Sequence, residues 1–595
     1  MFQIQVWDGN QAASYVAYAY SEVAAIYPIT PSSPMAEYCD RWQAAGKKNL
    51  FGSPLQLAQM QSEAGAAAAL HGALLSGVLG TTFTSSQGLL LMLPNIYRMA
   101  GELLPGVIHV AARTIATHAL SIFGDHSDLY ACRQTGAAIF ITSSVQEVMD
   151  LSPVAHLAAI EGQLPFLNCF DGFRTSHELQ KIRVWEVQDL KSLLPTAALE
   201  KFRKRALHPS HGRIYGSAQN PDIFFQTREA SNPFYDALPG IVEKQITRIN
   251  TLLGTHYGLF EYYGNPDATH VVVAMGSVCE TIKEYLDTVR ELPYGLICVH
   301  LYRPFSVTHF TACLPDTATQ VTVLSRTKEP GAPGEPLYLD VAAALLQNGR
   351  TCRIFSGRYG LSSRDTTPAQ ISAVFSNTRK SIFTVGIEDD VTHLSLSVPA
   401  PSETVPCNTA AAVSDSSRTS HTISCKFWGL GGDGTVSATK NAIKLIGLHT
   451  SKNVQGYFEY DSKKSRGLTI SHLRFGTAPI RSSYLISKAD FVACHNPAYL
   501  HKYQMIEEVK DGGSFLLNCA YRGEALEQFL PDSFKNYART HKISIYLIDA
   551  LGIGKEIGLN DKISTILQAA FFSISGLLPA EEAKQHMKEA AAKSY

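Results

Sequence analysis

The 595-residue sequence lacks the closely spaced cysteines that zinc and iron–sulfur proteins use as ligands. It has 11 cysteines, an odd number, but no CxxC pair, and no two of them stand closer than 15 positions. We therefore expect no metal ion or cluster to be ligated by this chain. Scattered cysteines are typical of reduced thiols in an intracellular protein, which predicts a cytoplasmic location.

An excess of charge of either sign is also missing. The chain has 51 Lys and Arg residues against 52 Asp and Glu residues, for a net charge of -1. This balance excludes a strongly basic nucleic-acid platform. The N-terminus shows no basic leader before an apolar run, and the most apolar stretch, 64–80, is interrupted by His71 and rich in Gly and Ala. It predicts a buried core helix, with His71 a satisfied core histidine, and no membrane partner.

What is present is a large amount of apolar sequence. Hydrophobic residues make up 45% of the chain and charged residues only 17%, which indicates large buried cores and surface buried between domains or subunits. The length predicts three or four domains. We expect a homo-oligomer, such as a dimer.

The first predicted domain covers residues 1–255. Apolar strands at 107–112 and 137–142 and a helix at 147–162 alternate in the manner of an α/β fold with a parallel sheet. Residues 207–240 are rich in Pro, Gly and Asn. They predict a long irregular arm rather than a compact layer.

Two further α/β domains follow. The second, 256–399, has a strand at 269–277, a helix after it and more strands. Residues 400–421 are dominated by Ser, Thr, Ala and Pro, which is typical of a linker. The third domain, 422–595, completes three successive open α/β domains with mostly parallel sheets.

Three polar residues of the first domain are candidate site residues. Thr30 is flanked by prolines that restrict its backbone, Ser62 can cap a helix with Glu63 in its first turn, and Arg113 directly follows an apolar strand. Ligands of α/β sheets bind at such strand ends, and an arginine can grip a carboxylate through two hydrogen bonds. Taken singly, each could be structural: a turn residue, a carboxylate favoured by the helix dipole, and a surface ion pair. Taken together, they favour a site.

A glycine-rich segment of the third domain offers a second candidate site. GLGGDGT at 429–435 follows a short strand and precedes a helix, so its backbone N–H groups can face a phosphate. Tight turns also need glycine. Lys463, Lys464 and Ser465 stand in YDSKKSRG, which is otherwise a solvated charged loop.

Long strings of this sequence closely resemble the N-terminal portion of the pyruvate:ferredoxin (flavodoxin) oxidoreductase family. The matching strings in the first domain are YPITPSS at 27–33, QSEAGAA at 61–67, TTFTSSQGLLLM at 81–92, FGDHSD at 123–128 and GFRTSHELQKI at 172–182. The second domain contributes VVVAMGSVCETIKEYLD at 271–287, RTKEPGAPGEPLYLDV at 326–341 and GRYGLSSRD at 357–365. The resemblance covers essentially the whole chain.

The resemblance implies a fold and a set of roles. The first two domains are expected to be transketolase-like and the third to be of the CoA-binding type. Thr30 and Arg113 are implied to bind the 2-oxoacid carboxylate, and Glu63 to contact the aminopyrimidine ring of thiamine diphosphate, where a glutamate can assist proton transfer. The implied CoA candidates are Gly431, Asp433, Gly434, Thr435, Lys463, Lys464 and Ser465.

The resemblance also implies parts that this sequence does not contain. Members of the family add a cysteine-rich ferredoxin-like segment with [4Fe-4S] clusters and a domain for Mg²⁺ and the diphosphate. We therefore expect this chain to need a partner chain or C-terminal half, with ferredoxin or flavodoxin as the indirect electron acceptor. The main alternative is a non-catalytic relative that uses the same interface for assembly. A transketolase-like enzyme without clusters is disfavoured because no diphosphate motif is present.

Overall fold

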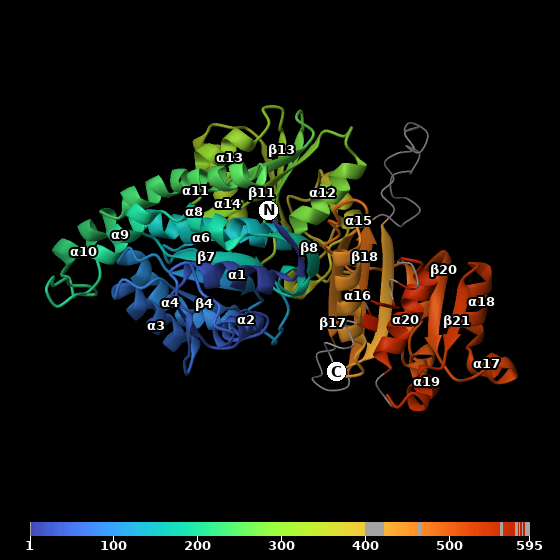
Figure 1. Ribbon diagram of the computed structural model, residues 1–595. Coiled ribbons are helices and arrows are strands. Elements are labelled where there is room, and N and C mark those ends of the chain that lie inside the picture. Colours follow the sequence, from blue (N-terminus) through green and yellow to red (C-terminus); the bar gives the residue numbers. More distant parts are fainter. Residues whose placement is uncertain are drawn as a thin grey trace.

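The computed structural model describes residues 2–398, 422–460, 467–559, 563–577 and a few positions beyond. The linker at 400–421 and the candidates Lys463, Lys464 and Ser465 lie outside the described residues. The described chain forms three sheets with helices packed on them, which confirms the α/β class with mostly parallel strands. Figure 1 shows the first two sheets in one lobe and the third in a second lobe.

The first sheet has seven strands in the order β12-β6-β7-β5-β4-β2-β3, and its pairs from β6 to β3 are parallel. Its strands are β2 (Val23–Ile26), β3 (Gln56–Gln59), β4 (Gly80–Thr84), β5 (Val107–Ala112), β6 (Ala138–Thr142) and β7 (Phe166–Asp171). The main helices are α1 (Gly9–Tyr20), α2 (Ser33–Ala44), α3 (Glu63–Leu75), α4 (Ser86–Gly101) and α6 (Val145–Gly162). The expected strands at 107–112 and 137–142 and the helix at 147–162 are all present.

The second sheet has six strands in the order β15-β14-β13-β10-β11-β9. They are β9 (Phe260–Gly264), β10 (His270–Ala274), β11 (Tyr294–Val299), β13 (Gln320–Ser325), β14 (Arg353–Arg358) and β15 (Ile382–Thr384), of which β9 alone pairs antiparallel. Its helices are α12 (Val278–Thr288), α13 (Val307–Cys313), α14 (Pro336–Gln347) and α15 (Pro368–Ser376). A short strand from this part of the chain, β12 (Leu301–Arg303), leaves it and pairs antiparallel with β6 at the edge of the first sheet.

The third sheet includes strands from outside the predicted third domain. Its eight strands follow the order β1-β8-β17-β18-β16-β19-β20-β21. The six from the C-terminal part are β16 (Ile423–Leu430), β17 (Asn453–Tyr460), β18 (Leu468–Gly476), β19 (Ala489–Cys494), β20 (Val509–Asn518) and β21 (Ser544–Ile548), with helices α16 (Thr435–His449), α18 (Asp532–Thr540) and α20 (Ser564–Ser575). The other two, β1 (Gln3–Trp7) and β8 (Leu179–Val184), belong to the predicted first domain.

Three strands show that the domain boundaries predicted from the sequence do not coincide with the boundaries of the sheets. Boundaries at 255 and 421 separate stretches of sequence, but β1, β8 and β12 each pair in a sheet outside their own stretch. Short strands give no sign in the sequence of which sheet they join. The three units are therefore tied together by backbone hydrogen bonds.

The segment 207–240 is an exposed arm, as expected; its first part, 207–220, is irregular, but most of the remainder is helical. Helix α10 (Pro221–Glu229) lies within it, and helix α11 (Asn232–Leu253) begins there. Each helix has a proline near its start. These prolines make the sequence resemble an irregular segment, although proline is well suited to the first turn of a helix. Residues 208–230 are nearly all exposed, and Figure 1 shows this arm at the far end of the first lobe.

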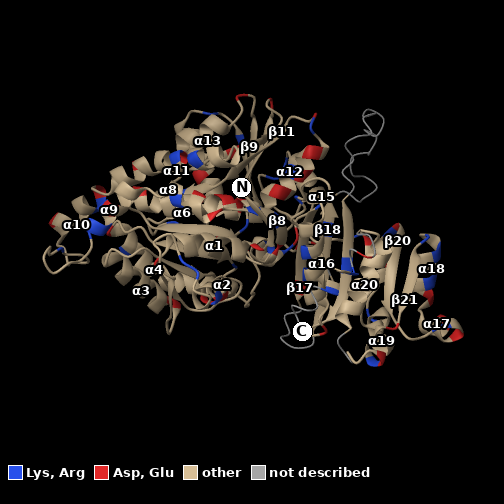
Figure 2. Cartoon of the chain, viewed as in Figure 1, with Lys and Arg blue, Asp and Glu red and all other residues tan. Residues whose placement is uncertain are grey.

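The distribution of charged residues and the state of the cysteines agree with the sequence analysis. Figure 2 shows Lys and Arg interspersed with Asp and Glu over both lobes. The ten cysteines that the structure describes are all free thiols. Among the described residues, no helix is both long and apolar enough to span a bilayer.

Candidate functional site

Arg113 and Thr30 lie together at the carboxyl edge of the first sheet. Arg113 is the first residue after β5, and Thr30 stands in the loop between β2 and α2. The guanidinium Nη1 of Arg113 donates a hydrogen bond of 2.8 Å to the carbonyl oxygen of Thr30. The side chain of Thr30 is exposed, so its hydroxyl remains available to a ligand.

The Arg113 guanidinium is buried without a carboxylate partner among the described residues. Only 6% of Arg113 is exposed, and its Nε has no hydrogen-bond partner. Burial lowers the pKa of Arg113, while the negative charge of Asp128 raises it. A buried, incompletely bonded cation is costly unless an anion joins it. The residue therefore fits a carboxylate ligand better than the surface ion pair that was the alternative.

Asp128 fixes the backbone of this arginine and the backbone at the start of helix α4. Its Oδ2 accepts hydrogen bonds from the backbone N–H of Arg113 at 2.9 Å and of Ser86 at 2.8 Å, and its Oδ1 accepts one from Leu129 at 2.8 Å. Ser86 starts helix α4 with a φ of +51°, a strained conformation for a residue with a side chain. Burial raises the pKa of Asp128 to about 7.

Glu63 is the first residue of helix α3 and is 7% exposed. The predicted cap is present, since the Ser62 hydroxyl accepts a hydrogen bond from the N–H of Gly65 at 3.2 Å. Glu63 packs against Gly88 of helix α4, where an added Cβ would lie 2.9 Å from its Oε1 and 2.6 Å from the hydroxyl of Thr84. Only glycine leaves this space open.

The residues around Glu63 fit the ring of a thiamine cofactor. We find no hydrogen bond to the Glu63 carboxylate within the part of the chain that the structure describes. The buried hydroxyls of Thr82 and Thr84 also lack partners. Buried polar atoms are normally bonded, so this group of free acceptors and donors suits a polar heterocycle. Gly88, Thr84 and Asp128 were not singled out by the sequence, although all three stand inside the strings that carried the resemblance.

The glycine-rich turn lies between β16 and α16, as expected, but much of its hydrogen bonding is internal. Asp433 accepts from the N–H of Leu430 at 2.7 Å and of Thr435 at 2.8 Å, and the N–H of Gly431 bonds to Gly467. The Thr435 side chain is buried and bonds to His495 at 2.7 Å. Asp433 and Thr435 therefore shape the turn. Gly432 and Ser437 are exposed, which leaves room for a ligand beside it.

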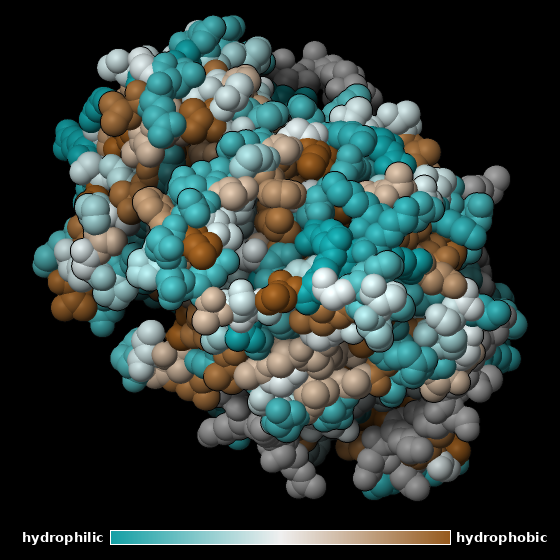
Figure 3. Space-filling model, turned by 90° about the vertical axis from the view of Figure 1, so that its left-hand side faces the viewer, coloured by the Kyte–Doolittle hydropathy of each residue, from teal (hydrophilic) through white to brown (hydrophobic). Residues whose placement is uncertain are grey.

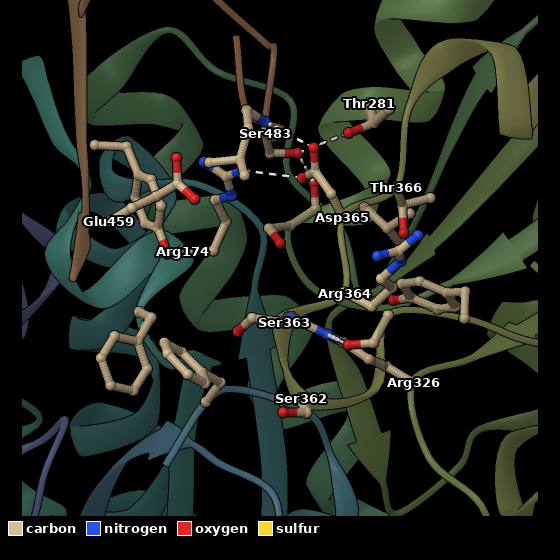
Figure 4. Close-up of a pocket in the computed structure, with 18 of the residues that line it drawn as sticks. Arg174, Thr281, Arg326, Ser362, Ser363, Arg364, Asp365, Thr366, Glu459 and Ser483 are labelled. Carbon is tan, nitrogen blue, oxygen red and sulfur yellow. Dashed lines mark hydrogen bonds and ion pairs between the residues drawn. The ribbon is translucent and has the colours of Figure 1, made fainter. Parts of the chain in front are cut away.

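A cavity of about 220 Å³ lies where the three units meet. Figure 4 shows Arg174, Asp365 and Glu459 approaching it from different parts of the chain, with Arg326 and Ser363 on another side. Arg174 bonds to Asp365 at 3.2 Å and stacks on Tyr457 with its guanidinium 4.2 Å from the ring centre. Ser362 and Ser363 have φ values of +53° and +56°. Arg174 stands in GFRTSHELQKI, and Ser362, Ser363 and Asp365 stand in GRYGLSSRD, yet the sequence assigned them no role.

The histidines near the site have structural partners. His71 of helix α3 forms a hydrogen bond of 2.5 Å with Glu102, so the hydrogen bonding of this buried histidine is satisfied, as expected. His126 bonds to the buried Asp171 at 2.5 Å. Among the described residues, no group of three or more His, Cys, Asp or Glu side chains is arranged to hold a metal ion.

Three family models match the chain. One described as "Pyruvate flavodoxin/ferredoxin oxidoreductase, thiamine diP-bdg" covers residues 15–246. "Pyruvate:ferredoxin oxidoreductase core domain II" covers 268–371, and "Pyruvate ferredoxin/flavodoxin oxidoreductase" covers 424–594. Together they extend over all three units.

Curated relatives match the chain along its whole length. The pyruvate:ferredoxin oxidoreductase of Moorella thermoacetica is 54% identical over 99% of this chain and 50% of its own. The pyruvate-flavodoxin oxidoreductase of Klebsiella pneumoniae is 53% identical over 100% of this chain and 50% of its own. The chain thus spans about half the length of these relatives. A solved 2-oxoglutarate:ferredoxin oxidoreductase from Magnetococcus marinus matches at 18% identity with a TM-score of 0.46, covering 62% of this chain and 64% of that one.

Proposed function

Because the chain belongs to the pyruvate ferredoxin/flavodoxin oxidoreductase family, we propose that it is the substrate- and CoA-binding portion of a thiamine-diphosphate-dependent enzyme. The reaction is the oxidative decarboxylation of pyruvate to acetyl-CoA, with electrons passed to ferredoxin or flavodoxin in the cytoplasm. The observation that carries the proposal is the buried Arg113 guanidinium, which has an unbonded Nε beside Thr30.

In this proposal, Arg113 and Thr30 bind and orient the substrate carboxylate. The free N–H of Arg113 and the Thr30 hydroxyl donate hydrogen bonds to its oxygens, and charge-assisted bonds of this kind are stronger than neutral ones. Because the Arg113 backbone is held by Asp128, the cation needs little rearrangement when substrate enters. Such preorganisation favours a fixed position of the keto carbon.

Glu63 has a separate role in this proposal. Bound thiamine diphosphate supplies the carbon nucleophile and the electron sink for decarboxylation. The Glu63 carboxylate accepts and returns a proton at a nitrogen of the aminopyrimidine ring, as a general acid–base group. Its burial against Gly88 keeps water from competing for that carboxylate. The match to a thiamine-binding family model over residues 15–246 supports this role.

We place the CoA contacts on the third unit, at Gly431, Gly434 and the N-terminal turn of α16. Asp433 and Thr435 contribute by shaping this turn, and Lys463, Lys464 and Ser465 are added from the resemblance. Mg²⁺ and the [4Fe-4S] clusters belong to the remaining portion of the enzyme. That portion is the proposed partner of this chain.

We also propose that two copies assemble through the arm at 207–240. Its exposed apolar side chains support this, since Phe225 is 73% exposed and Ile214 is 85% exposed. Figure 3 shows small groups of hydrophobic residues interspersed with hydrophilic ones on this side of the molecule. Exposed apolar groups of this kind are typical of contact surfaces.

The proposal is tested by combining the chain with a polypeptide equivalent to the rest of its relatives. With pyruvate and CoA, the assembly is expected to release carbon dioxide and reduce a viologen dye. The chain alone is expected to be colourless and inactive. Stoichiometric iron and sulfide in the pure chain would contradict the division of parts. A stable assembly without pyruvate-dependent dye reduction would favour the alternative, a non-catalytic relative.

A further inference from the structure

Asp171 joins the second unit to the first at the end of β7. It is fully buried, and its Oδ2 pairs with Nη1 of Arg326 at 2.9 Å and accepts the N–H of Ser277 at 2.8 Å. The Ser277 hydroxyl also donates to Oδ2, and His126 bonds to Oδ1. Although burial raises the pKa of Asp171, Arg326 and His126 hold it well below its usual range. A charge buried this deeply persists only with such partners.

The two residues from the second unit are themselves fixed. Arg326 directly follows β13, and its Nε donates to the carbonyl of Gly360 at 2.9 Å, while its own carbonyl accepts the N–H of His126 at 2.9 Å. Ser277 follows Gly276, which has a φ of +73° and lies so close that an added Cβ would be 2.9 Å from Asp171. The contact therefore requires this turn in this conformation.

Asp171 is connected to the backbone of the proposed substrate residues through its neighbour Gly172. The next residue, Gly172, donates its N–H to the carbonyl of Ala112 at 2.9 Å, and Ala112 precedes Arg113. A Cβ on Gly172 would lie 2.3 Å from that carbonyl and 3.0 Å from Cγ of Pro31, the residue after Thr30. Gly172 thus touches both chain segments that carry the substrate groups.

We propose that Arg326 and Ser277 are positioning residues for the substrate site of the other unit. They hold Asp171, Asp171 fixes Gly172, and Gly172 sets the separation of Arg113 and Thr30. The second unit then contributes to pyruvate binding without touching the substrate. The inference rests on the proposed function for its kinetic consequence, but the mechanical connection can be measured without it.

The kinetic test is a double-mutant cycle in the assembled enzyme. Arg326→Met is expected to lower kcat/KM for pyruvate by about tenfold or more, because small displacements of binding groups are costly. In an Arg113→Ala background the same change is expected to have little effect, since the positioned group is already gone. Additive losses in the cycle would overturn the inference. Ser277→Ala, which removes one hydroxyl and keeps every charge, repeats the cycle if Arg326→Met fails to fold.

The second test follows backbone hydrogen exchange in this chain, with no substrate or cofactor. Ser277→Ala and Arg326→Lys are expected to speed exchange in the segments around residues 29–33 and 110–114. Arg358→Met is the matched control, because it breaks an ion pair of the same unit with Glu335 at 3.4 Å that does not contact Asp171. Unchanged exchange in Ser277→Ala and Arg326→Lys, or an equal increase in the control Arg358→Met, would overturn the mechanical connection. An assembly that turns over no pyruvate would instead overturn the proposed function, and the exchange result would still decide this inference.

Discussion

Burial of the Arg113 guanidinium disfavours its charge, and among the described residues its side chain has one hydrogen-bond acceptor, the carbonyl oxygen of Thr30. Such a group gains most when a carboxylate completes its hydrogen bonds. Arg113→Ala is therefore expected to reduce kcat/KM for pyruvate by about tenfold or more, since charge-assisted bonds contribute about 1.5–3 kcal/mol. Arg290→Ala, at an exposed ion pair with Asp287, serves as the control. An unchanged specificity constant for pyruvate would remove Arg113 from the site.

Substitution of Glu63 distinguishes an enzyme from the alternative, a non-catalytic relative. Glutamine keeps the shape of the side chain and is tolerated in a helix, so Glu63→Gln is expected to melt near the wild-type temperature. It cannot take up a proton from a ring nitrogen, and turnover is expected to fall by about 10²–10⁴-fold. Thermal melting and steady-state turnover are measured together, with the exposed Glu37→Gln as control. Normal turnover in the folded Glu63→Gln variant would shift the weight to the non-catalytic alternative.

At this scale the sequence could predict where the candidate site residues lie, but not which residues hold them in place. Arg113 after an apolar strand and Glu63 after a capping serine follow from local pattern. Asp128 does not, because its three hydrogen bonds join segments that are up to 42 residues apart. Gly88 is equally hidden, since its importance depends on what an added Cβ would strike in another helix.

At the scale of elements, several hydrogen bonds join the start of helix α4 to the end of strand β5. The Ser85 hydroxyl bonds to the carbonyl of Ala111 at 2.8 Å and the Ser86 hydroxyl to that of Thr114 at 2.6 Å. Asp128 adds the acceptor for two backbone N–H groups between them. These contacts bring polar groups of two βα units to one edge of the sheet.

The Asp128 contacts can be ranked by substitution. Asp128→Ala leaves three buried N–H groups without an acceptor, and each such loss costs about 1–3 kcal/mol. Asp128→Asn retains one oxygen and loses fewer bonds. We expect the denaturant midpoint to fall in the order wild type, Asp128→Asn, Asp128→Ala. An alanine variant as stable as wild type would show that Asp128 does not join these elements.

Element boundaries were predictable where one chain segment decides them. Strand β5 and helix α6 follow from periodicity and apolar runs. Helix α10 is hard to predict because it begins at a proline, a residue equally common in irregular segments. The positions of β1, β8 and β12 could not be predicted, because pairing of short strands is decided by the folded surroundings.

Across the whole molecule, buried neutral histidines predict acid sensitivity. Burial lowers the pKa of each, to about 3 for His109 and about 4 for His270. Among the described residues, the histidines with a lowered pKa are His109, His156, His177, His270, His472 and His495. Below pH 6.5 the unfolded chain binds protons that the folded chain does not, so stability falls as pH falls, by up to about 1.4 kcal/mol per pH unit for each histidine.

Buried acids with a raised pKa oppose this trend, and so does His300, whose pKa is raised, despite its burial, to about 10 by neighbouring acidic groups. Burial raises the pKa of Asp8 to about 6 and of Asp128 and Asp150 to about 7, so each loses stability as pH rises toward those values. We expect the six histidines to outweigh these groups, because their unfolded pKa of about 6.5 lies inside this pH range. The midpoint of guanidinium chloride denaturation is then expected to be lower at pH 5.5 than at pH 7. His270→Gln should narrow the difference. A higher midpoint at pH 5.5 would mean that the acids outweigh the histidines.

The sheet shared by the two ends of the chain has a consequence during synthesis. Strand β8 ends at residue 184 and its neighbour β17 begins at residue 453, a gap of 453 − 184 = 269 positions. At about 5–20 residues per second, a ribosome needs roughly 15 s to a minute to cross that gap. Throughout this interval the outer edge of β8 presents unpaired N–H and C=O groups. Each nascent chain thus passes through a timed period in which it is open to wrong strand partners and to chaperones, and this period closes only when β17 leaves the ribosome.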